Sequence, residues 1–202
     1  MGRPPTIDDP RGTILQAAAR LFAEKGYEAS SLGELAERAG TSKAGVYHYF
    51  ATKQQIYDAI TLHVLGGLVQ AVQAAVGSQK GAQQRLEAFM LAHADFFEHN
   101  YYGFVVMLTA FGGMAAPDMK QEAVRLRDAH EQLLRSILNE GMRSGEFSAT
   151  LDPAQAGRAV LSMLNWMVRW FRPGAGDSAR QVAAGYFHLL LGGLKNAQPA
   201  VP

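Results

Sequence analysis

The chain has 202 residues, of which 48% are hydrophobic, and its 19 Lys and Arg against 18 Asp and Glu give a formal net charge of +1. This composition excludes a disordered chain, a collagen and a disulfide scaffold, and it suits one or two globular units. Because cysteine is absent, a disulfide, a thiolate metal site and a cysteine nucleophile are excluded, and a reducing cytoplasm is the expected compartment. A near-neutral charge by itself argues against nucleic-acid binding.

Two stretches, residues 59–79 and 100–117, contain no Asp, Glu, Lys or Arg and approach the roughly 20 residues that span a bilayer. Histidine, glutamine and serine interrupt the first, while glycines and Pro117 interrupt the second. Both are therefore expected to be buried helices of a protein that has no membrane partner.

Apolar residues recur at three- and four-residue spacing in nearly every segment between turn signals, and period-two alternation is absent. The pattern predicts an all-α chain. Its first helix is expected to begin with Asp9 as N-cap and Pro10 in the first position, and to end at Gly26.

Two short capped helices are predicted next, over residues 32–39 and 43–49, and a capped fourth helix begins at residue 53, from which the chain forms long helical segments. The residues expected to cap or stop them are Ser31 with Glu34, Gly40, Thr41, Ser42 and Thr52. A helix, a tight turn with glycine and a helix of about two turns form the geometry that places the second helix in the DNA major groove.

The residue types of the helix over 43–49 fit that use. Lys43 can donate to guanine or to a phosphate, and Gly45 lets the helix approach the bases closely. Lys53 and the free N–H groups of the next helix can together hold a phosphate.

Three consecutive polar-tipped rings, Tyr47, His48 and Tyr49, cannot all point inward from one helix. They suit contacts with thymine methyls and phosphate oxygens. Val46 and Phe50, in contrast, are expected to be core residues.

The stretch from Arg11 to Ile60 resembles the DNA-binding domain of the TetR family of transcriptional regulators. The residues that carry the resemblance are Ile14, Ala17, Leu21, Phe22, Gly26, Tyr27, Leu35, Ala36, Ala39, Gly40, Ser42, Gly45, Tyr47, Tyr49, Phe50 and Lys53. It implies a dimer of subunits with about nine helices, in which an N-terminal helix-turn-helix domain binds a palindromic operator in double-stranded DNA. A C-terminal helical domain then binds a small effector and forms the dimer.

By this resemblance, residues 9–69 form the DNA-binding domain, with the helix-turn-helix over about 32–53, and residues 70–196 form the effector-binding and dimerisation domain. The residues that would contact bases or the DNA backbone are Ser42, Lys43, Gly45, Tyr47 and His48. Those that would hold phosphates are Ser31, Tyr49 and Lys53. Arg3 could reach the minor groove or serve as a solubilising surface residue.

Large apolar side chains are dense between residues 84 and 172, and most of them must be ordinary core. The resemblance favours an effector pocket among them. The residues expected to line it are Phe97, Tyr101, Phe104, Met107, Phe111, Trp166, Arg169 and Trp170.

The last two helices, over residues 153–171 and 177–194, are apolar on more than one face, which indicates burial on more than one side. One face of the first carries Ala159, Met163, Trp166 and Trp170, and another carries Val160, Leu164, Met167 and Phe171. A four-helix bundle from two subunits explains both faces.

Three runs, residues 145–147, 163–166 and 169–174, resemble a narrower group of the family that senses acyl-CoA thioesters. Arg169 and Arg172 could bind CoA phosphates or be surface residues at a helix end. A regulator of an efflux or resistance gene that senses hydrophobic drugs is the alternative.

An enzyme is the remote alternative, through His93, Asp95, Glu98 and His99. Only two of these share a helical face, and a metal site needs three or four converging ligands. We therefore expect no catalytic residues, no metal and no cofactor.

Residues 1–55 contain seven Lys and Arg against six Asp and Glu. The cations of a DNA-binding half must therefore act by position, and the salt dependence of DNA binding is expected to be modest.

Overall fold

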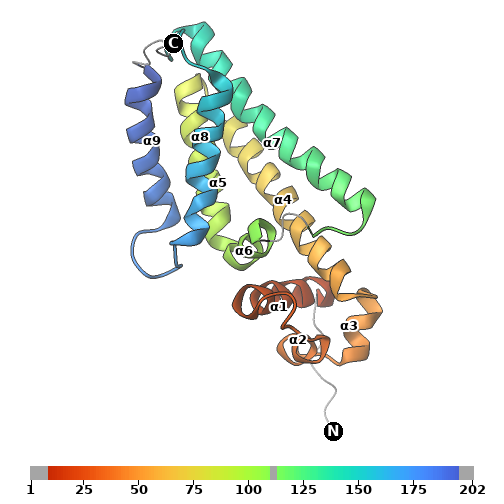
Figure 1. The fold of residues 1–202 in the computed structure, drawn as a ribbon. Coiled ribbons are helices and arrows are strands. Elements are labelled where there is room, and N and C mark those ends of the chain that lie inside the picture. The colour runs from red at the N-terminus through yellow and green to blue at the C-terminus, as the bar shows by residue number, and fades with distance from the viewer. Residues whose placement is uncertain (1–8, 110–112, 196–202) are drawn as a thin grey trace. The chain divides into compact units, whose positions relative to one another are not determined.

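The computed structural model describes residues 9–109 and 113–195. Over these ranges it holds nine α-helices and one 3₁₀ turn without a strand (Figure 1), so the all-α prediction is confirmed. The elements are α1 Pro10–Lys25, α2 Leu32–Arg38, α3 Lys43–Tyr49, α4 Lys53–Gly77, α5 Ala82–His99, α6 Tyr101–Thr109, α7 Pro117–Ser144, α8 Pro153–Trp166, η1 Met167–Arg169 and α9 Ala179–Lys195. Arg3 and Phe111 lie outside the described residues.

The chain divides into two compact units. Unit 1 comprises residues 1–64 and 102–123, and unit 2 comprises residues 65–101 and 124–202. This division differs from the expected boundary near residue 69, because residues 102–123 cluster with the N-terminal helices and α4 contributes to both units.

The predicted caps define the helices of unit 1. Asp9 Oδ1 accepts a hydrogen bond from the Gly12 N–H at 2.9 Å, and Ser31 Oγ accepts one from the Glu34 N–H at 3.1 Å. Gly40, after α2, has φ 64°, a left-handed conformation that L side chains rarely adopt. The turn between α2 and α3 therefore depends on glycine.

Side chains from α1 to α4 form the core of unit 1. The residues that are at most 5% exposed there include Ile14, Leu21, Phe22, Leu35, Val46, Phe50 and Ile56. Val46 and Phe50 confirm their predicted core role, and they fix which side of α3 faces outward.

In unit 2, α5 packs against α8 and α9 (Figure 1). Asp152 caps α8 by accepting from the N–H groups of Ala154 and Gln155. The last helices are shorter than predicted, because η1 tightens the chain after Trp166 and α9 begins at Ala179 rather than residue 177.

α4 is long and apolar enough to cross a membrane by length and composition. Half of its most apolar 18-residue window is buried within the protein. A core helix of a soluble protein has the same properties.

Candidate DNA-binding and effector sites

α3 presents a polar aromatic face to solvent. Tyr47 is 48% exposed and Tyr49 is 40% exposed, and His48 is exposed as well. The Lys43 ammonium lies 5.9 Å from the centroid of the Tyr47 ring, and the rings of His48 and Tyr49 meet edge to face at 4.9 Å. The structure thus gathers Lys43 and all three predicted rings on the outer side of one two-turn helix.

Gly45 leaves room for the side chain of Thr41. A Cβ at this position would overlap the hydroxyl oxygen of Thr41 and approach Ser42 Oγ to 3.5 Å. A larger residue at position 45 would therefore require the Thr41 side chain to move.

Ser31 and Ser42 are both exposed and both act as helix N-caps. Ser42 Oγ accepts from the Gly45 N–H at 3.0 Å, as Ser31 Oγ does from Glu34. A hydroxyl that accepts a cap bond still carries one O–H donor. Each serine therefore keeps a donor for a phosphate oxygen.

Lys53 is held by the backbone of the turn between α1 and α2. Its ammonium donates to the carbonyl oxygens of Tyr27 at 2.7 Å, Ser30 at 3.0 Å and Glu28 at 3.4 Å, and lies 4.3 Å from the centroid of the Tyr27 ring. An ammonium has three N–H donors, so these carbonyls use them all. Lys53 therefore holds this turn in place.

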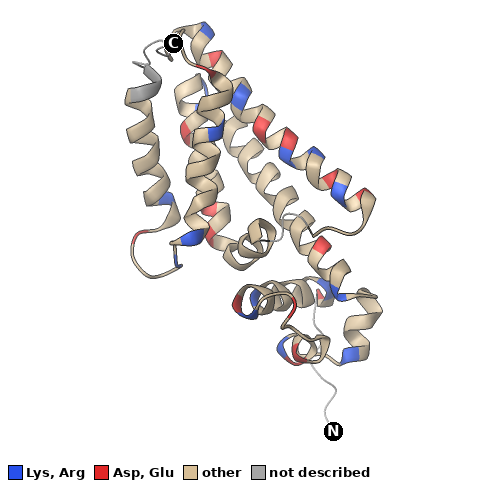
Figure 2. Cartoon of the chain, viewed as in Figure 1, with Lys and Arg blue, Asp and Glu red and all other residues tan. Residues whose placement is uncertain are grey.

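Ion pairs occupy three further cations of unit 1. Glu24 pairs with Arg38 at 2.6 Å and with Arg20 at 2.8 Å, and Glu34 pairs with Lys25 at 2.6 Å. Arg38, and then Arg20, lower the pKa of Glu24, while Lys25 lowers the pKa of Glu34. Figure 2 shows the basic and acidic positions of α1 and α2 side by side.

Two cations of this region lie over rings instead of acids. They are Lys43, over Tyr47, and Arg11, whose guanidinium carbon is 5.2 Å from the centroid of the Phe50 ring. Among the described residues of α1 to α3, Lys43 and Arg11 are thus the cations left for phosphate groups.

The predicted effector residues are distributed over both units. Phe104 and Met107 are buried in unit 1, whereas Phe97 is buried in unit 2. Trp166, at 64%, and Trp170, at 49%, are among the most exposed large apolar residues. The remaining predicted residues are Tyr101, which is half-buried, Arg169, which is exposed, and Phe111, which lies outside the described residues.

An aromatic cluster joins several of these residues in unit 2. The ring of Phe97 meets Tyr101 at 5.8 Å and Phe171 at 5.4 Å, both edge to face. Arg172 donates to the Tyr101 hydroxyl at 3.1 Å, and the Arg169 guanidinium lies 5.3 Å from the centroid of the Trp166 ring. Arg172 therefore borders the cluster, and Arg169 lies over Trp166.

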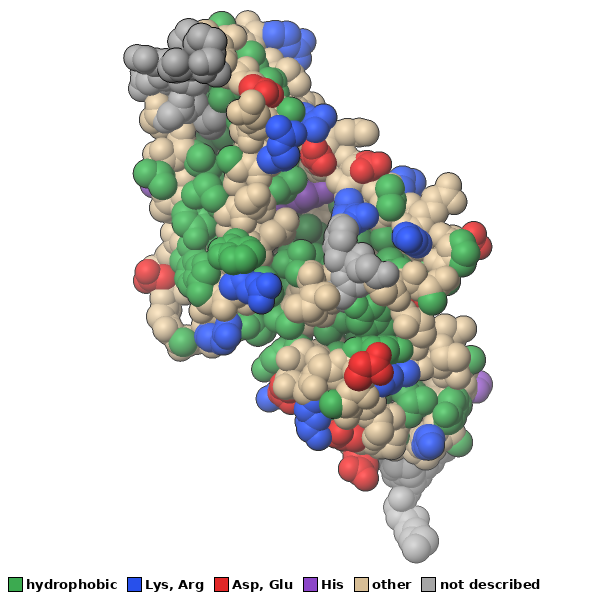
Figure 3. Space-filling view, in the orientation of Figure 1, with side chains coloured by type: hydrophobic (Ala, Val, Ile, Leu, Met, Phe, Trp, Pro, Cys, Tyr) green, Lys and Arg blue, Asp and Glu red, His purple; other side chains and the backbone are tan. Residues whose placement is uncertain are grey.

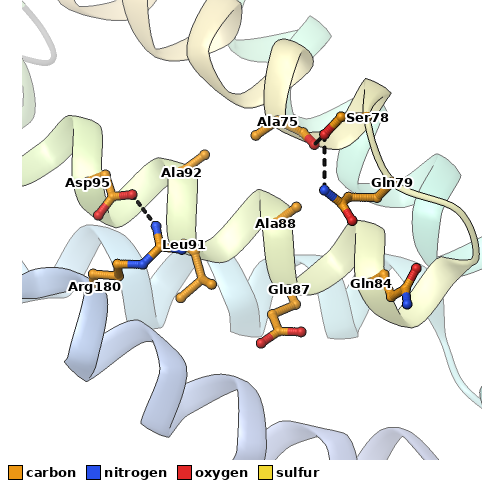
Figure 4. Close-up of a pocket in the computed structure, with 10 residues that line it drawn as sticks. All are labelled: Ala75, Ser78, Gln79, Gln84, Glu87, Ala88, Leu91, Ala92, Asp95 and Arg180. Carbon is orange, nitrogen blue, oxygen red and sulfur yellow. Dashed lines mark hydrogen bonds and ion pairs between the residues drawn. The ribbon is translucent and has the colours of Figure 1, made fainter.

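A separate pocket of about 450 Å³ opens among α4, α5 and α9 (Figure 4). An ion pair between Asp95 and Arg180 bounds one end of it, and Ser78 and Gln79 lie at another. Its lining residues differ from the predicted effector residues.

Two histidines are buried inside unit 2. His93 Nδ1 lies 3.3 Å from His130 Nε2, and the His130 ring packs on Phe89 at 4.6 Å. Burial lowers the pKa of His130 to about 4 and, with the neighbouring His130, holds the pKa of His93 well below its ordinary value. His130 Nδ1 has no hydrogen-bond partner within the described part of the chain.

The structure gives the acidic residues of the suggested metal cluster other roles. Asp95 pairs with Arg180, and Glu98 Oε2 accepts from the Ala179 N–H at 2.8 Å, at the start of α9. His99 Nδ1 bonds with the carbonyl oxygen of Asp95 at 2.7 Å. Residues 9–109 and 113–195 hold no group of three or more potential metal ligands.

The two apolar faces predicted for residues 153–171, which form α8, η1 and the two residues after it, have different surroundings. Val160, Leu164, Met167 and Phe171 are buried within the subunit, while Ala159, Trp166 and Trp170 are exposed. Leu189 on α9 is 73% exposed, and the sequence does not single it out because it is the first of three consecutive leucines, Leu189 to Leu191. Figure 3 shows apolar side chains gathered over α8 and α9.

Comparisons with known proteins agree with this arrangement. Residues 14–60 match the family model "Bacterial regulatory proteins, tetR family", and residues 79–194 match "Tetracyclin repressor-like, C-terminal domain". The structure of the TetR family regulator PfmR from Thermus thermophilus is 47% identical, with a TM-score of 0.84 over 91% of this chain and 99% of that one.

Two further proteins show the same fold. The repressor KstR2 of Mycobacterium tuberculosis is 27% identical over 93% of this chain and 94% of its own length, and the structure of KstR2, described as a ketosteroid transcriptional regulator, has a TM-score of 0.86. AibR, solved with isovaleryl coenzyme A and operator DNA, is 23% identical, with a TM-score of 0.77 over 89% of this chain and 97% of that one. The chain therefore belongs to the TetR family, as a ligand-responsive transcriptional repressor.

Proposed function

We propose that the chain works in the cytoplasm as a homodimer that binds a palindromic operator through α3 and releases it when an acyl-CoA thioester binds. The observation that carries the DNA part is the exposed face of α3, where Lys43 and three polar-tipped rings stand together. Buried Val46 and Phe50 hold the opposite side of the helix, so this face is presented rigidly.

In this proposal, Lys43, Tyr47 and His48 contact bases or backbone in the major groove. Ser31, Ser42 and Tyr49 donate hydroxyl hydrogen bonds to phosphate oxygens. Ser31 and Ser42 stand at the N-termini of α2 and α3, where backbone N–H groups also favour an anion.

The exposed apolar side chains of α8 and α9 support the homodimer. Trp166 and Leu189 are 64% and 73% exposed, and large apolar residues in one patch mark a protein interface. A two-fold axis would bring the same patch of both subunits together as a four-helix bundle. Recognition helices about 34 Å apart would then reach successive major grooves.

The aromatic cluster of unit 2 and its arginines support the acyl-CoA effector. Phe97, Tyr101 and Phe171 form an apolar cluster that an acyl chain would enter by displacing buried rings, and Arg169 and Arg172 offer cations for CoA phosphates. AibR shares the fold and was solved with isovaleryl coenzyme A, and we extend that ligand class to this chain as part of the proposal.

The imidazole of His130 supports a neutral polar group in the effector. Its lowered pKa keeps the ring uncharged at neutral pH, and its Nδ1 is buried without a partner in the described residues. A buried polar atom of this kind gains a hydrogen bond from a neutral oxygen, whereas a free carboxylate would lose its hydration without a counter-charge.

Thermal shift with short- and long-chain acyl-CoAs, the matching free acids and hydrophobic drugs tests the effector class. We expect stabilisation by thioesters, and weakening of about tenfold in their affinity in Arg169→Met or Arg172→Met, with Arg143→Met as the control. A thioester that lowers operator affinity must bind the DNA-free conformation more tightly. Stabilisation by drugs alone would instead favour the efflux regulator.

A further inference from the structure

The side chain of Gln54, in the first turn of α4, connects three separate segments of unit 1. Its Oε1 accepts a hydrogen bond from the Tyr27 hydroxyl at 3.2 Å. Its Nε2 donates to Asp58 Oδ1 at 2.8 Å and to the Gly113 carbonyl oxygen at 2.7 Å. Both N–H donors of the amide and its oxygen are therefore used.

Asp58 extends the connection to the segment before α7. The residue is 1% exposed, and its Oδ2 accepts from the Ala116 backbone N–H at 3.4 Å while Oδ1 accepts from Gln54. A buried carboxylate is costly unless it is hydrogen-bonded. Gln54 and Asp58 together thus clasp both ends of residues 113–116.

The other end of the connection is the turn between α1 and α2. The Tyr27 ring packs edge to face on Phe22 at 5.4 Å and on Tyr57 at 5.1 Å, and burial raises the pKa of its hydroxyl. The hydroxyl therefore stays protonated and donates to Gln54. Lys53 binds the carbonyls of the same turn, which leads directly into Ser31, the N-cap of α2.

We propose that Gln54 is a positioning residue for DNA binding, which makes the placement of the helix-turn-helix depend on the segment 113–116. The inference deepens the proposed function, because Phe104 and Met107, two of the predicted effector residues, lie on α6, the helix that precedes this segment. The clasp connects Gly113, in the segment that precedes α7, with Tyr27 in the turn that precedes α2. None of the residues in the clasp needs to touch DNA.

Hydrogen exchange on the full-length protein tests the clasp, with Gln54→Met as the variant and Gln73→Met, an exposed position of the same helix, as the matched control. Gln54→Met keeps the length of the side chain and removes all three hydrogen bonds. Because each contributes a factor of about 2 to 12, we expect exchange at the amides of residues 113–116 and 27–31 to rise about tenfold or more. Gln73→Met should change neither segment.

DNA affinity tests the coupling, with a duplex that the wild-type protein selects from a random-sequence library. Gln54→Met should raise the Kd about tenfold or more, and Tyr27→Phe should raise it less. Tyr27→Phe should add nothing in the Gln54→Met background, because both changes break one connection. If the two side chains acted independently, their losses in DNA-binding free energy would instead add.

Two results would overturn the inference. One is that hydrogen exchange at residues 113–116 is unchanged in Gln54→Met; the other is that exchange there is faster but the Kd for DNA equals that of Gln73→Met. If Gln54→Met does not fold, Tyr27→Phe, which removes a single hydroxyl, must still speed exchange in both segments. Failure of the wild-type protein to select any duplex would count against the proposed function, whereas the exchange result would still decide the clasp.

Discussion

The Lys53 ammonium donates to the Tyr27 carbonyl oxygen at 2.7 Å and lies 4.3 Å from the centroid of the ring of the same residue. A cation at the start of α4 thus holds the turn that leads into the helix-turn-helix, with Ser30 and Glu28 as further acceptors. The sequence predicted a phosphate contact for this lysine. The two roles differ in the way DNA binding would depend on salt.

Lys53→Met should lower operator affinity by about tenfold or more and lower the melting temperature, because three carbonyls lose a charged donor. The slope of log Kd against log salt should stay unchanged, since the ammonium neutralises no phosphate. Lys43→Met is the contrasting variant, and its slope should fall in magnitude by about 0.9 per subunit. If the slope fell by the same amount in Lys53→Met, Lys53 would contact a phosphate as the sequence predicted.

The total salt slope should be modest. With Arg20, Lys25 and Arg38 paired with carboxylates, Lys43 and Arg11 remain among the described cations of α1 to α3. A dimer in which these four cations pair with phosphates gives a slope of about −4. Titration of the selected duplex between low and high salt measures it. A slope near −10, that of a strongly basic repressor, would contradict this charge assignment.

Tyr47→Ala should lower operator affinity by about tenfold or more, because the ring is exposed on α3 and contributes nothing to the core. Its circular dichroism spectrum and its oligomeric state should match the wild type. Tyr102→Ala, at an exposed tyrosine of α6, is the control. Equal DNA affinity in both variants would mean that α3 does not read the operator through this ring.

Much of this site could be predicted from the sequence because helix caps and the core side of α3 are local properties. Asp9, Ser31 and Ser42 cap where expected, and Val46 and Phe50 are buried. The partners of a long side chain depend on the tertiary structure and are not local. The sequence therefore predicts Lys53 to be a phosphate ligand, whereas in the structure its partners are carbonyl oxygens 23 to 26 residues earlier in the chain.

The clasp was missed for the same reason. Gln54 and Asp58 are one helical turn apart, and in the sequence they resemble the solvated start of α4. Their partners lie far along the chain: Gly113 is 59 residues from Gln54, and Ala116 is 58 residues from Asp58. The signal that could have found them is Asp58, an acid at a position of α4 that apolar residues flank on both sides, Tyr57 and Ala59.

Leu189→Glu or Trp166→Glu should convert the proposed dimer to a monomer, because each places a charge in an apolar patch that a second subunit would bury. Val124→Glu, at a 39% exposed position of α7, is the control and should remain dimeric. Analytical ultracentrifugation at micromolar concentration measures the mass. A monomeric wild-type protein, or dimers in all three variants, would rule out the α8 and α9 interface.

The buried histidine pair should make stability depend on pH below neutrality. In the folded protein the pKa of His130 is about 4, whereas an unfolded histidine titrates near 6.5. Between these values the unfolded chain binds more protons, so stability is fully present above about pH 6.5 and is lost as the pH falls toward 4. His130 alone should lower the free energy of unfolding by roughly 2 kcal/mol between pH 7 and pH 5, and His93, whose pKa is shifted in the same direction, should add to this loss.

Urea unfolding at both pH values measures this loss. The variant His130→Gln removes the titration of His130, and His63→Gln, at an exposed position of α4, is the control. His130→Gln should lose part of the pH dependence, and an undiminished dependence would show that other groups cause it.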